Sequence, residues 1–172
     1  MSIVEFVVDD FWHIEIKGFG LVRVSLETIH RLAEYRQLLD DQPESGGVLI
    51  GQHINSFGKI VINDFTPPQK TDNQSRFSYF RSRHHNKLVN KAWSDSDGHS
   101  TYVGLWHTHP EPNPTPSTTD FSDWRNTLNE SIFAGERLFF FIVGQERMRC
   151  WVGKKTYIRN TFKQVGEFKF YD

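Results

Sequence analysis

The chain has 172 residues, a length typical of one compact domain with an ordinary hydrophobic core. Its 20 Lys and Arg residues against 21 Asp and Glu residues give a net charge of -1, which disfavours binding to nucleic acid or anionic lipid through overall charge. The single cysteine, Cys150, excludes internal disulfides and four-cysteine zinc sites and fits a reducing cytoplasm.

The N-terminal half is predicted to contain short strands and one helix. Ser25 is the expected N-cap of that helix, because apolar residues recur after it at helical spacing as far as Leu39. Apolar runs bounded by turn residues predict strands over residues 3–8, 11–16, 48–50 and 59–65. No apolar run approaches the roughly 18 residues of a membrane span, and the acidic N-terminus does not resemble a signal peptide, so we expect a cytoplasmic protein with no membrane partner.

The C-terminal half contains two more predicted helices. A polar loop over residues 69–75 leads to a short strand over residues 76–80 and then to a helix that closes near Asp95. Ser117 is expected to cap the next helix, since the acid Asp120 stands three residues further on. The remaining strands are expected over residues 101–107, 137–143 and 148–152, the last two forming a hairpin.

Strand-rich segments interrupted by about three helices predict an α/β (α+β) fold. We expect a single domain over residues 1–172, with a mixed, mainly antiparallel sheet flanked by the helices. The order of the strands in that sheet stays open.

The chemistry is concentrated in Gly104-Leu105-Trp106-His107-Thr108-His109-Pro110 and in Asp120. On a strand, residues two apart point to the same face, so His107 and His109 present two imidazoles side by side. A loop long enough to fold back can add the carboxylate of Asp120. Two histidines and one carboxylate would bind zinc and leave one position for water, as hydrolytic sites do. The sequence therefore predicts a hydrolase with a Zn²⁺ site formed by His107, His109 and Asp120.

Each part of this pattern also has a simpler interpretation. Two histidines in a strand are commonly surface or packing residues, and Ser117 with Asp120 is by itself only a helix cap. A non-haem iron site uses similar ligands, but its usual order, His-x-acid with a distant histidine, differs from this one. The combination of all the residues favours zinc.

The combined motif resembles the JAB/MPN metallopeptidases. In that family a Glu precedes the motif His-Ser/Thr-His-Pro. Seven residues separate the second His of the motif from a Ser, and two more separate this Ser from an Asp. In this chain His109, Ser117 and Asp120 have the same spacing. The upstream acid matches Glu44, which two glycines follow closely. The resemblance implies that Glu44 is the general base and that Ser117 stabilises the water or the oxyanion. We expect the glycines to let the backbone approach a substrate.

The resemblance also implies a substrate class. The family cleaves bonds at the C-terminal tail of ubiquitin or ubiquitin-like proteins, and this short chain is most similar to the prokaryotic JAB branch, in particular to the JAB peptidases of anti-phage CBASS operons. A conjugated CBASS nucleotidyltransferase is thus one expected partner. A non-catalytic scaffold or a module that binds protein tails is the alternative.

Other features are given structural interpretations. The stretch Arg76–His85 alternates basic side chains with aromatic rings that could stack on single-stranded nucleic acid. The nearly neutral net charge of the whole chain argues against such a partner. His84 and His85 are expected to be solvated at the start of a helix, and His13 to lie on the surface. Cys150 is expected to be a small buried apolar residue.

Overall fold

The protein was analysed as a computed structural model that describes residues 2–55 and 58–171. The helices of this part of the chain are α1 (Leu26–Ala33), α2 (His84–Asp95) and α3 (Thr118–Glu130). Its strands are β1 (Ile3–Val8), β2 (Phe11–Ile16), β3 (Gly20–Ser25), β4 (Gly46–Asn55), β5 (Lys59–Phe65), β6 (Asn73–Ser75), β7 (Ser78–Phe80), β8 (Thr101–Thr108), β9 (Arg137–Val143), β10 (Arg147–Lys154) and β11 (Thr161–Lys169). None of the helices in these two ranges has the length and apolar character needed to cross a membrane.

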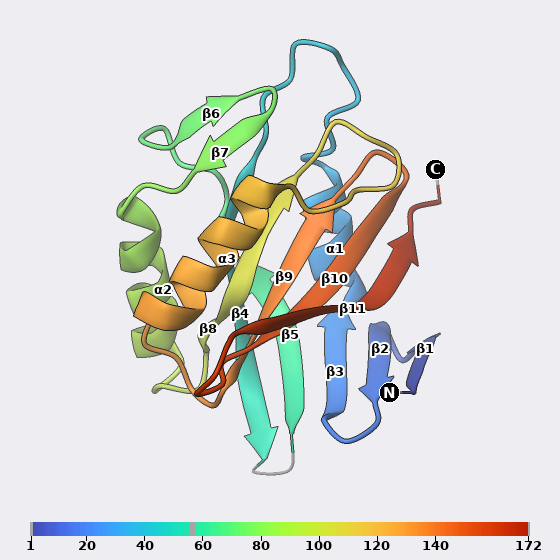
Figure 1. Cartoon of the computed structure of the whole chain (residues 1–172), viewed down its shortest axis with the longest axis vertical. Helices are drawn as coiled ribbons and strands as arrows, with labels where there is room; N and C mark the ends of the chain where they lie inside the picture. The colour runs from blue at the N-terminus through green and yellow to red at the C-terminus, as the bar shows by residue number, and fades with distance from the viewer. Residues whose placement is uncertain (1, 56–57, 172) are drawn as a thin grey trace.

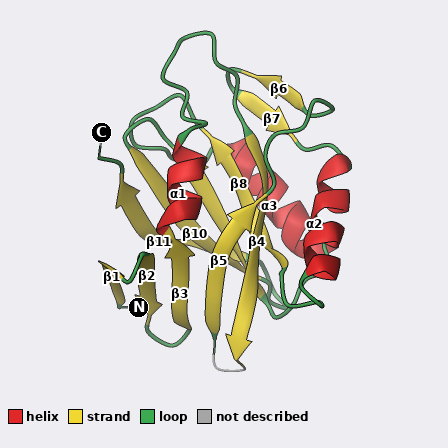
Figure 2. Ribbon diagram, turned by 180° about the vertical axis from the view of Figure 1, so that it is seen from behind, coloured by secondary structure: helices red, strands yellow, loops and turns green. Residues whose placement is uncertain are grey.

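The described strands form one large sheet and one small hairpin. The large sheet has nine strands in the order β1-β2-β3-β5-β4-β8-β9-β10-β11, and β6 pairs only with β7. Neighbours are antiparallel except for the parallel pairs β3–β5 and β8–β9. Helix α1 covers one face of the sheet and α3 the other, as the two opposite views show (Figures 1 and 2). The predicted α/β (α+β) fold with a mainly antiparallel sheet is confirmed.

The two ends of the large sheet approach each other. The backbone amide of Glu167 on β11 donates to the carboxylate of Glu5 on β1 at 3.0 Å. The rings of Trp12 and Phe168 meet edge to face, with centroids 5.6 Å apart. The sheet therefore curls around the hydrophobic cluster that α1 covers, and the β1–β2 end and β11 form a seam.

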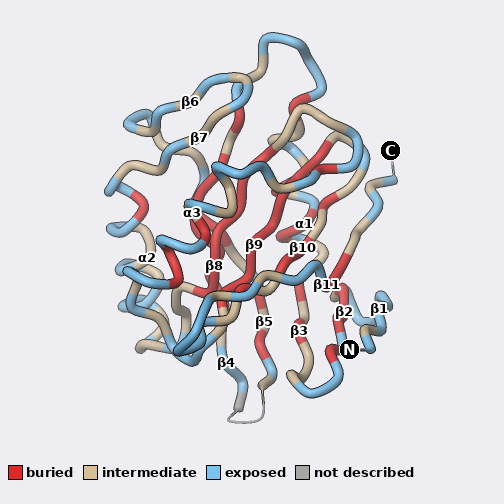
Figure 3. The backbone as a smooth tube through the Cα atoms, viewed as in Figure 1, coloured by how far each residue is buried: buried red, intermediate tan, exposed pale blue. Residues whose placement is uncertain are grey.

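Strand β9 has a hydrophobic cluster on each face. Phe139 and Phe141 point into the larger cluster with Ile29 of α1, whereas Phe140 points into a second cluster, where it stacks on Trp124 of α3 at 4.6 Å between centroids. All residues from Leu138 to Val143 are buried, which makes β9 the centre of the core (Figure 3). A strand covered on both faces is apolar at every position rather than at alternate ones.

The sequence-based boundaries hold in most places, but several elements differ, among them β4, which was predicted over residues 48–50 and runs from Gly46 to Asn55. Helix α1 begins after its N-cap Ser25, as predicted, but ends at Ala33, and Leu38 and Leu39 are 57% and 63% exposed. Beyond α1 the chain turns around the fully buried Gln37, whose side-chain amide donates to backbone oxygens of Gln42 and Arg76. Strands β3 and β11 were not predicted. The predicted loop 69–75 ends in β6, because the chain pairs there with β7.

Candidate metal centre

The predicted ligands lie where the C-terminal end of β8 meets the start of α3 (Figure 1). They line a cleft of about 590 Å³ together with Glu44, strand β7 and the first turns of α3. His107 is the penultimate residue of β8, and His109 follows the strand. The side chains of His107, His109 and Asp120 are only 10%, 12% and 15% exposed.

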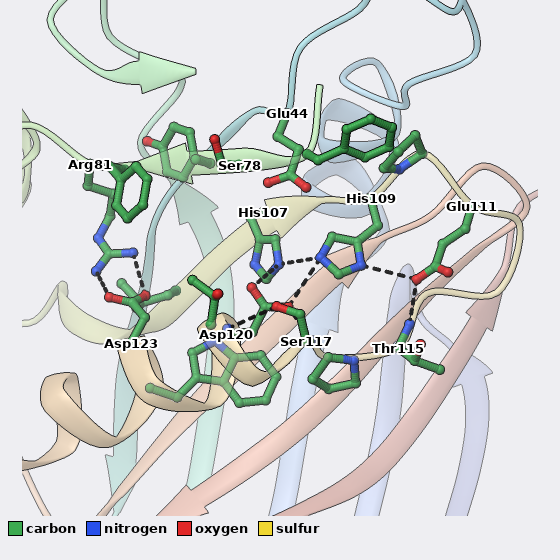
Figure 4. Close-up of a pocket in the computed structure, with 18 residues that line it drawn as sticks. Glu44, Ser78, Arg81, His107, His109, Glu111, Thr115, Ser117, Asp120 and Asp123 are labelled. Atoms are coloured by element: carbon green, nitrogen blue, oxygen red, sulfur yellow. Dashed lines mark hydrogen bonds and ion pairs between the residues drawn. The ribbon is translucent and has the colours of Figure 1, made fainter. Parts of the chain in front are cut away.

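The two imidazoles and the carboxylate point toward one another (Figure 4). Nε2 of His107 lies 3.0 Å from Nε2 of His109, and these nitrogens lie 3.1 and 3.2 Å from the two carboxylate oxygens of Asp120. Ligands about 2.0 Å from a tetrahedral zinc ion are separated by about 3.3 Å, so the spacing is close to that of three corners of such a tetrahedron. The donor set and its spacing fit zinc.

Asp120 is held in place by the start of its own helix. The hydroxyl of Ser117 accepts from the Asp120 amide at 3.1 Å, and the Ser117 amide donates to Oδ2 of Asp120 at 2.6 Å, which completes a capping box. Burial alone would raise the pKa of Asp120, but hydrogen bonds with His107 and His109 outweigh it and hold the pKa well below its usual range. The simple helix-cap interpretation is thus correct, and it is compatible with metal binding because one carboxylate can serve as both cap and ligand.

The ring of His109 is oriented by Glu111, a residue that the sequence analysis did not single out. Oε1 of Glu111 lies 3.1 Å from Nδ1 of His109 and accepts from the Thr115 amide at 2.8 Å. If Nδ1 carries the proton that Glu111 accepts, Nε2 of neutral His109 presents its lone pair to the cluster, as in many metal sites with a carboxylate behind the histidine. The signal in the sequence was an acid two residues after the second histidine.

Glu44 is buried, at 5% exposure, and its carboxylate points toward the histidine pair (Figure 4). Burial raises the pKa of Glu44 to about 7, against the lowering influence of His109, and the negative charge of Asp120 adds to the increase. A carboxyl group with such a pKa can both accept and release a proton near neutral pH. Glu44 lies outside the converging group of three side chains.

The segment that carries Glu44 is tied to β8 by Thr108, which lies between the two histidines. The Thr108 amide donates to the Ser45 carbonyl, and the Ser45 amide donates to Oγ1 of Thr108, both at 2.9 Å. The Thr108 hydroxyl in turn donates to Oε1 of Gln37 at 2.9 Å. Thr108 therefore faces away from the histidine side chains, as the strand alternation predicts, and anchors the chain beside Glu44.

The two glycines after Glu44 serve internal packing. A Cβ atom on Gly46 would lie 2.4 Å from Cε1 of Tyr79, and one on Gly47 would lie 2.2 Å from the carbonyl oxygen of Thr66. Such distances are impossible without rearrangement. The close approach that these glycines permit in the structure is to the protein's own side chains and backbone, and the expected approach to a substrate stays a prediction.

Two of the histidine predictions are wrong. His85 is 1% exposed and His13 is 7% exposed, so neither is a solvated side chain. His13 stacks on Phe6 with ring centroids 4.7 Å apart, and His85 is bound in a buried cluster described below. The prediction for Cys150 is confirmed, since it is fully buried.

Two bases of the stretch that could stack nucleic acid, Arg76 and Arg81, are engaged within the protein. Arg76 donates to the backbone oxygens of Leu39 and Asp40. Arg81 forms a two-pronged ion pair with Asp123 of α3, at 3.1 and 3.2 Å. The absence of a nucleic-acid partner stays a prediction.

Comparisons with known proteins agree with the motif. A family model described as prokaryotic homologs of the JAB domain matches residues 27–154. A Vibrio cholerae serotype O1 protein named CD-NTase/cGAS isopeptidase is 38% identical over 156 residues, which cover 90% of this chain and 91% of that protein. An Escherichia coli protein of the same name is 37% identical over 145 residues, or 84% and 86% of the two chains.

A solved structure supports the fold alone. The solution structure of protein DSY2949 from Desulfitobacterium hafniense matches with a TM-score of 0.55 at 15% identity, over 83% of this chain and 90% of that one.

Proposed function

The chain belongs to the family of prokaryotic homologs of the JAB domain, and from this membership we propose that it is a zinc-dependent isopeptidase. The observation that carries the proposal is the convergence of His107, His109 and Asp120 beside the buried acid Glu44 in one cleft. Two imidazoles and a carboxylate leave zinc an open position for a water or substrate ligand.

Each side chain has a separate task in this proposal. Zinc held by His107, His109 and Asp120 would supply a Lewis acid that makes water a nucleophile near neutral pH. Glu44, with its raised pKa, would take the proton from the attacking water and transfer it to the leaving amine. The Ser117 hydroxyl accepts from the Asp120 amide, so its own proton is available for donation to the negative charge that develops on the scissile carbonyl oxygen.

The names of the relatives support a substrate class. Because they are called CD-NTase/cGAS isopeptidases, we propose that this chain acts in an anti-phage CBASS system on a CD-NTase conjugate. The bond would lie at the C-terminal tail of a ubiquitin-like or otherwise conjugated protein. Within the described residues β7 pairs only with β6, and residues of β7 line the cleft, so its other edge can accept an extended tail as an added strand.

We also propose that residues 1–172 act as a single JAB unit. The strands outside the matched segment 27–154 belong to the same sheet as the strands inside it. The alternative function, a non-catalytic scaffold or tail-binding module, has no need of a buried acid such as Glu44 beside three converging side chains that could hold a metal, and the cleft contains both.

The proposal is tested by separating zinc content from turnover. Glu44→Gln is expected to keep stoichiometric zinc and to lose cleavage of an isopeptide-linked CD-NTase conjugate by at least about 100-fold. Asp120→Ala and His109→Ala are expected to lose the metal itself, as measured by elemental analysis after gel filtration. Asp123→Asn is the matched control, because Asp123 lies one turn further along α3 but pairs with Arg81.

Two results would contradict the proposal. If Asp120→Ala retained zinc as firmly as the parent, the ligand set would be wrong. If Glu44→Gln cleaved the conjugate at the parental rate, Glu44 would not be the base, and a zinc-loaded parent that bound the conjugate without cleaving it would favour the binding module.

A further inference from the structure

A buried polar cluster lies next to the cleft, and the proposed reaction does not use it. We call it the Asp72 cluster; it contains Asp72, Tyr79, His85 and Thr66. Nε2 of His85 lies 2.9 Å from Oδ2 of Asp72, and Nδ1 lies 2.6 Å from Oγ1 of Thr66. The side chains of Asp72 and His85 are 0% and 2% exposed. Removing a charge from water in this way is costly unless it is fully hydrogen-bonded.

Asp72 meets that condition. Its carboxylate accepts from the backbone amides of Gln69 and Ser82 and from the hydroxyl of Tyr79, each at 2.8 Å, as well as from His85. Burial alone would raise the pKa of Asp72, but these donors outweigh it and hold the pKa well below its usual range. Asp72 is therefore a permanent anion at neutral pH, around which the segment from Gln69 to His85 is arranged.

The same segment also forms hydrogen bonds with the backbone of Glu44. Glu44 lies in an irregular stretch between α1 and β4, and its amide donates to the Ser75 carbonyl at 2.7 Å. Its carbonyl accepts from Nε2 of Gln74 at 2.8 Å. Both partners belong to β6, so the hairpin β6–β7 holds the two backbone polar groups of Glu44.

Tyr79 connects this hairpin to both the Asp72 cluster and β4. It lies opposite Gln74 in the hairpin register, and its hydroxyl lies 2.8 Å from both Oδ2 of Asp72 and the carbonyl oxygen of Gly46. Its ring packs on Gly46, the position where any side chain would collide with it. Tyr79 thus attaches the hairpin to Gly46, which lies two residues after Glu44 in the chain.

We propose that the Asp72 cluster is a positioning device for Glu44: through Tyr79 and the β6–β7 hairpin it holds the carboxylate over the histidine pair. This inference rests on the proposed role of Glu44 as the base. It makes Tyr79 and Asp72 positioning residues, which affect the rate without contacting the reacting atoms. An error of about 1 Å in the position of a reacting group costs up to about 100-fold in rate.

The test uses Tyr79→Phe, which keeps the ring on Gly46 and removes only the hydroxyl. We expect kcat for conjugate cleavage to fall about tenfold, KM to stay within about twofold, and zinc content to be unchanged. Hydrogen exchange at the Glu44 amide should become faster, because the hairpin that accepts its hydrogen bond is released. Asp72→Asn, which removes the charge and keeps the shape, should act in the same direction. Tyr102→Phe is the matched control: it removes the hydroxyl of another partly buried tyrosine, whose partner is Ser131, and should change none of these values.

Other results would overturn the inference. Parental kcat and parental exchange at the Glu44 amide in Tyr79→Phe would show that the cluster does not position Glu44. A raised KM with parental kcat would make Tyr79 a wall of the substrate site instead. If the zinc-loaded parent cleaves nothing, the proposed function fails, and the exchange measurement, which needs no substrate, still decides on the positioning role.

Discussion

Ser117 has two proposed roles that its substitutions can separate. Its hydroxyl accepts from the Asp120 amide at 3.1 Å as an N-cap, and its proton is proposed to serve the scissile carbonyl oxygen. Replacing an N-cap serine by Ala costs about 1 kcal/mol of unfolding free energy, whereas Gly costs only a few tenths. Loss of an oxyanion donor costs about 3 kcal/mol in the transition state, or roughly 100-fold in kcat. The Ser117 amide, which donates to Asp120 at 2.6 Å, is kept in both variants.

We therefore expect Ser117→Ala and Ser117→Gly to lose kcat equally, although their unfolding free energies differ. Urea unfolding would give the stability, and conjugate cleavage by the zinc-loaded proteins would give kcat. Thr118→Ala, an exposed change one residue further on, is the control for both assays. A Ser117→Gly variant with nearly parental kcat, beside a slower Ser117→Ala, would refute the oxyanion role and leave the cap alone.

Two further predictions follow from carboxylates near the cleft. Glu111→Gln should weaken zinc binding about tenfold, and Glu111→Ala should weaken it further, up to about 100-fold, because His109 loses the acceptor that orients its ring. Competition with a chromophoric chelator measures the zinc affinity. An unchanged zinc affinity in Glu111→Ala would contradict the prediction. The pKa of Asp72 is lower in the folded chain than the unfolded value of about 3.9, so its stabilising contribution is complete above that pH and is lost as the pH falls toward the folded value. Asp72→Asn should consequently be less stable than the parent in urea at pH 6, with the difference narrowing below about pH 4; a difference that is constant with pH would be evidence against an ionised Asp72.

The ligand residues could be predicted because their geometry is local. Alternation along a strand aligns His107 with His109, and a capping box fixes Asp120 at the start of a helix, so each fragment carries its own conformational signal. Only the meeting of the two fragments is a tertiary event; the length of the intervening loop allowed it, and the family resemblance supported it. The metal-binding and catalytic roles of these residues stay predictions.

The surroundings could not be predicted because they depend on contacts between distant segments. Gln37 is buried because distant groups satisfy its side chain: Thr108, 71 residues further along, donates to its oxygen, and the carbonyl of Arg76, 39 residues along, accepts from its nitrogen. His85 seemed solvated at a helix start because nothing near it in sequence announces the buried Asp72, 13 residues earlier. The parallel pairing of β3 with β5 likewise leaves no trace in either strand, since hydrophobic alternation specifies a face and not a neighbour.

The seam between β1–β2 and β11 bears on how far the chain can be shortened. The family match covers residues 27–154, and both sides of the seam lie outside it. A version trimmed to those limits would lose Trp12 and Val165 together and leave part of the larger hydrophobic cluster open to water. The outer strands contribute no side chain to the cleft, so they support it indirectly, by covering the hydrophobic cluster that contains Trp106 of β8 and Phe141 of β9.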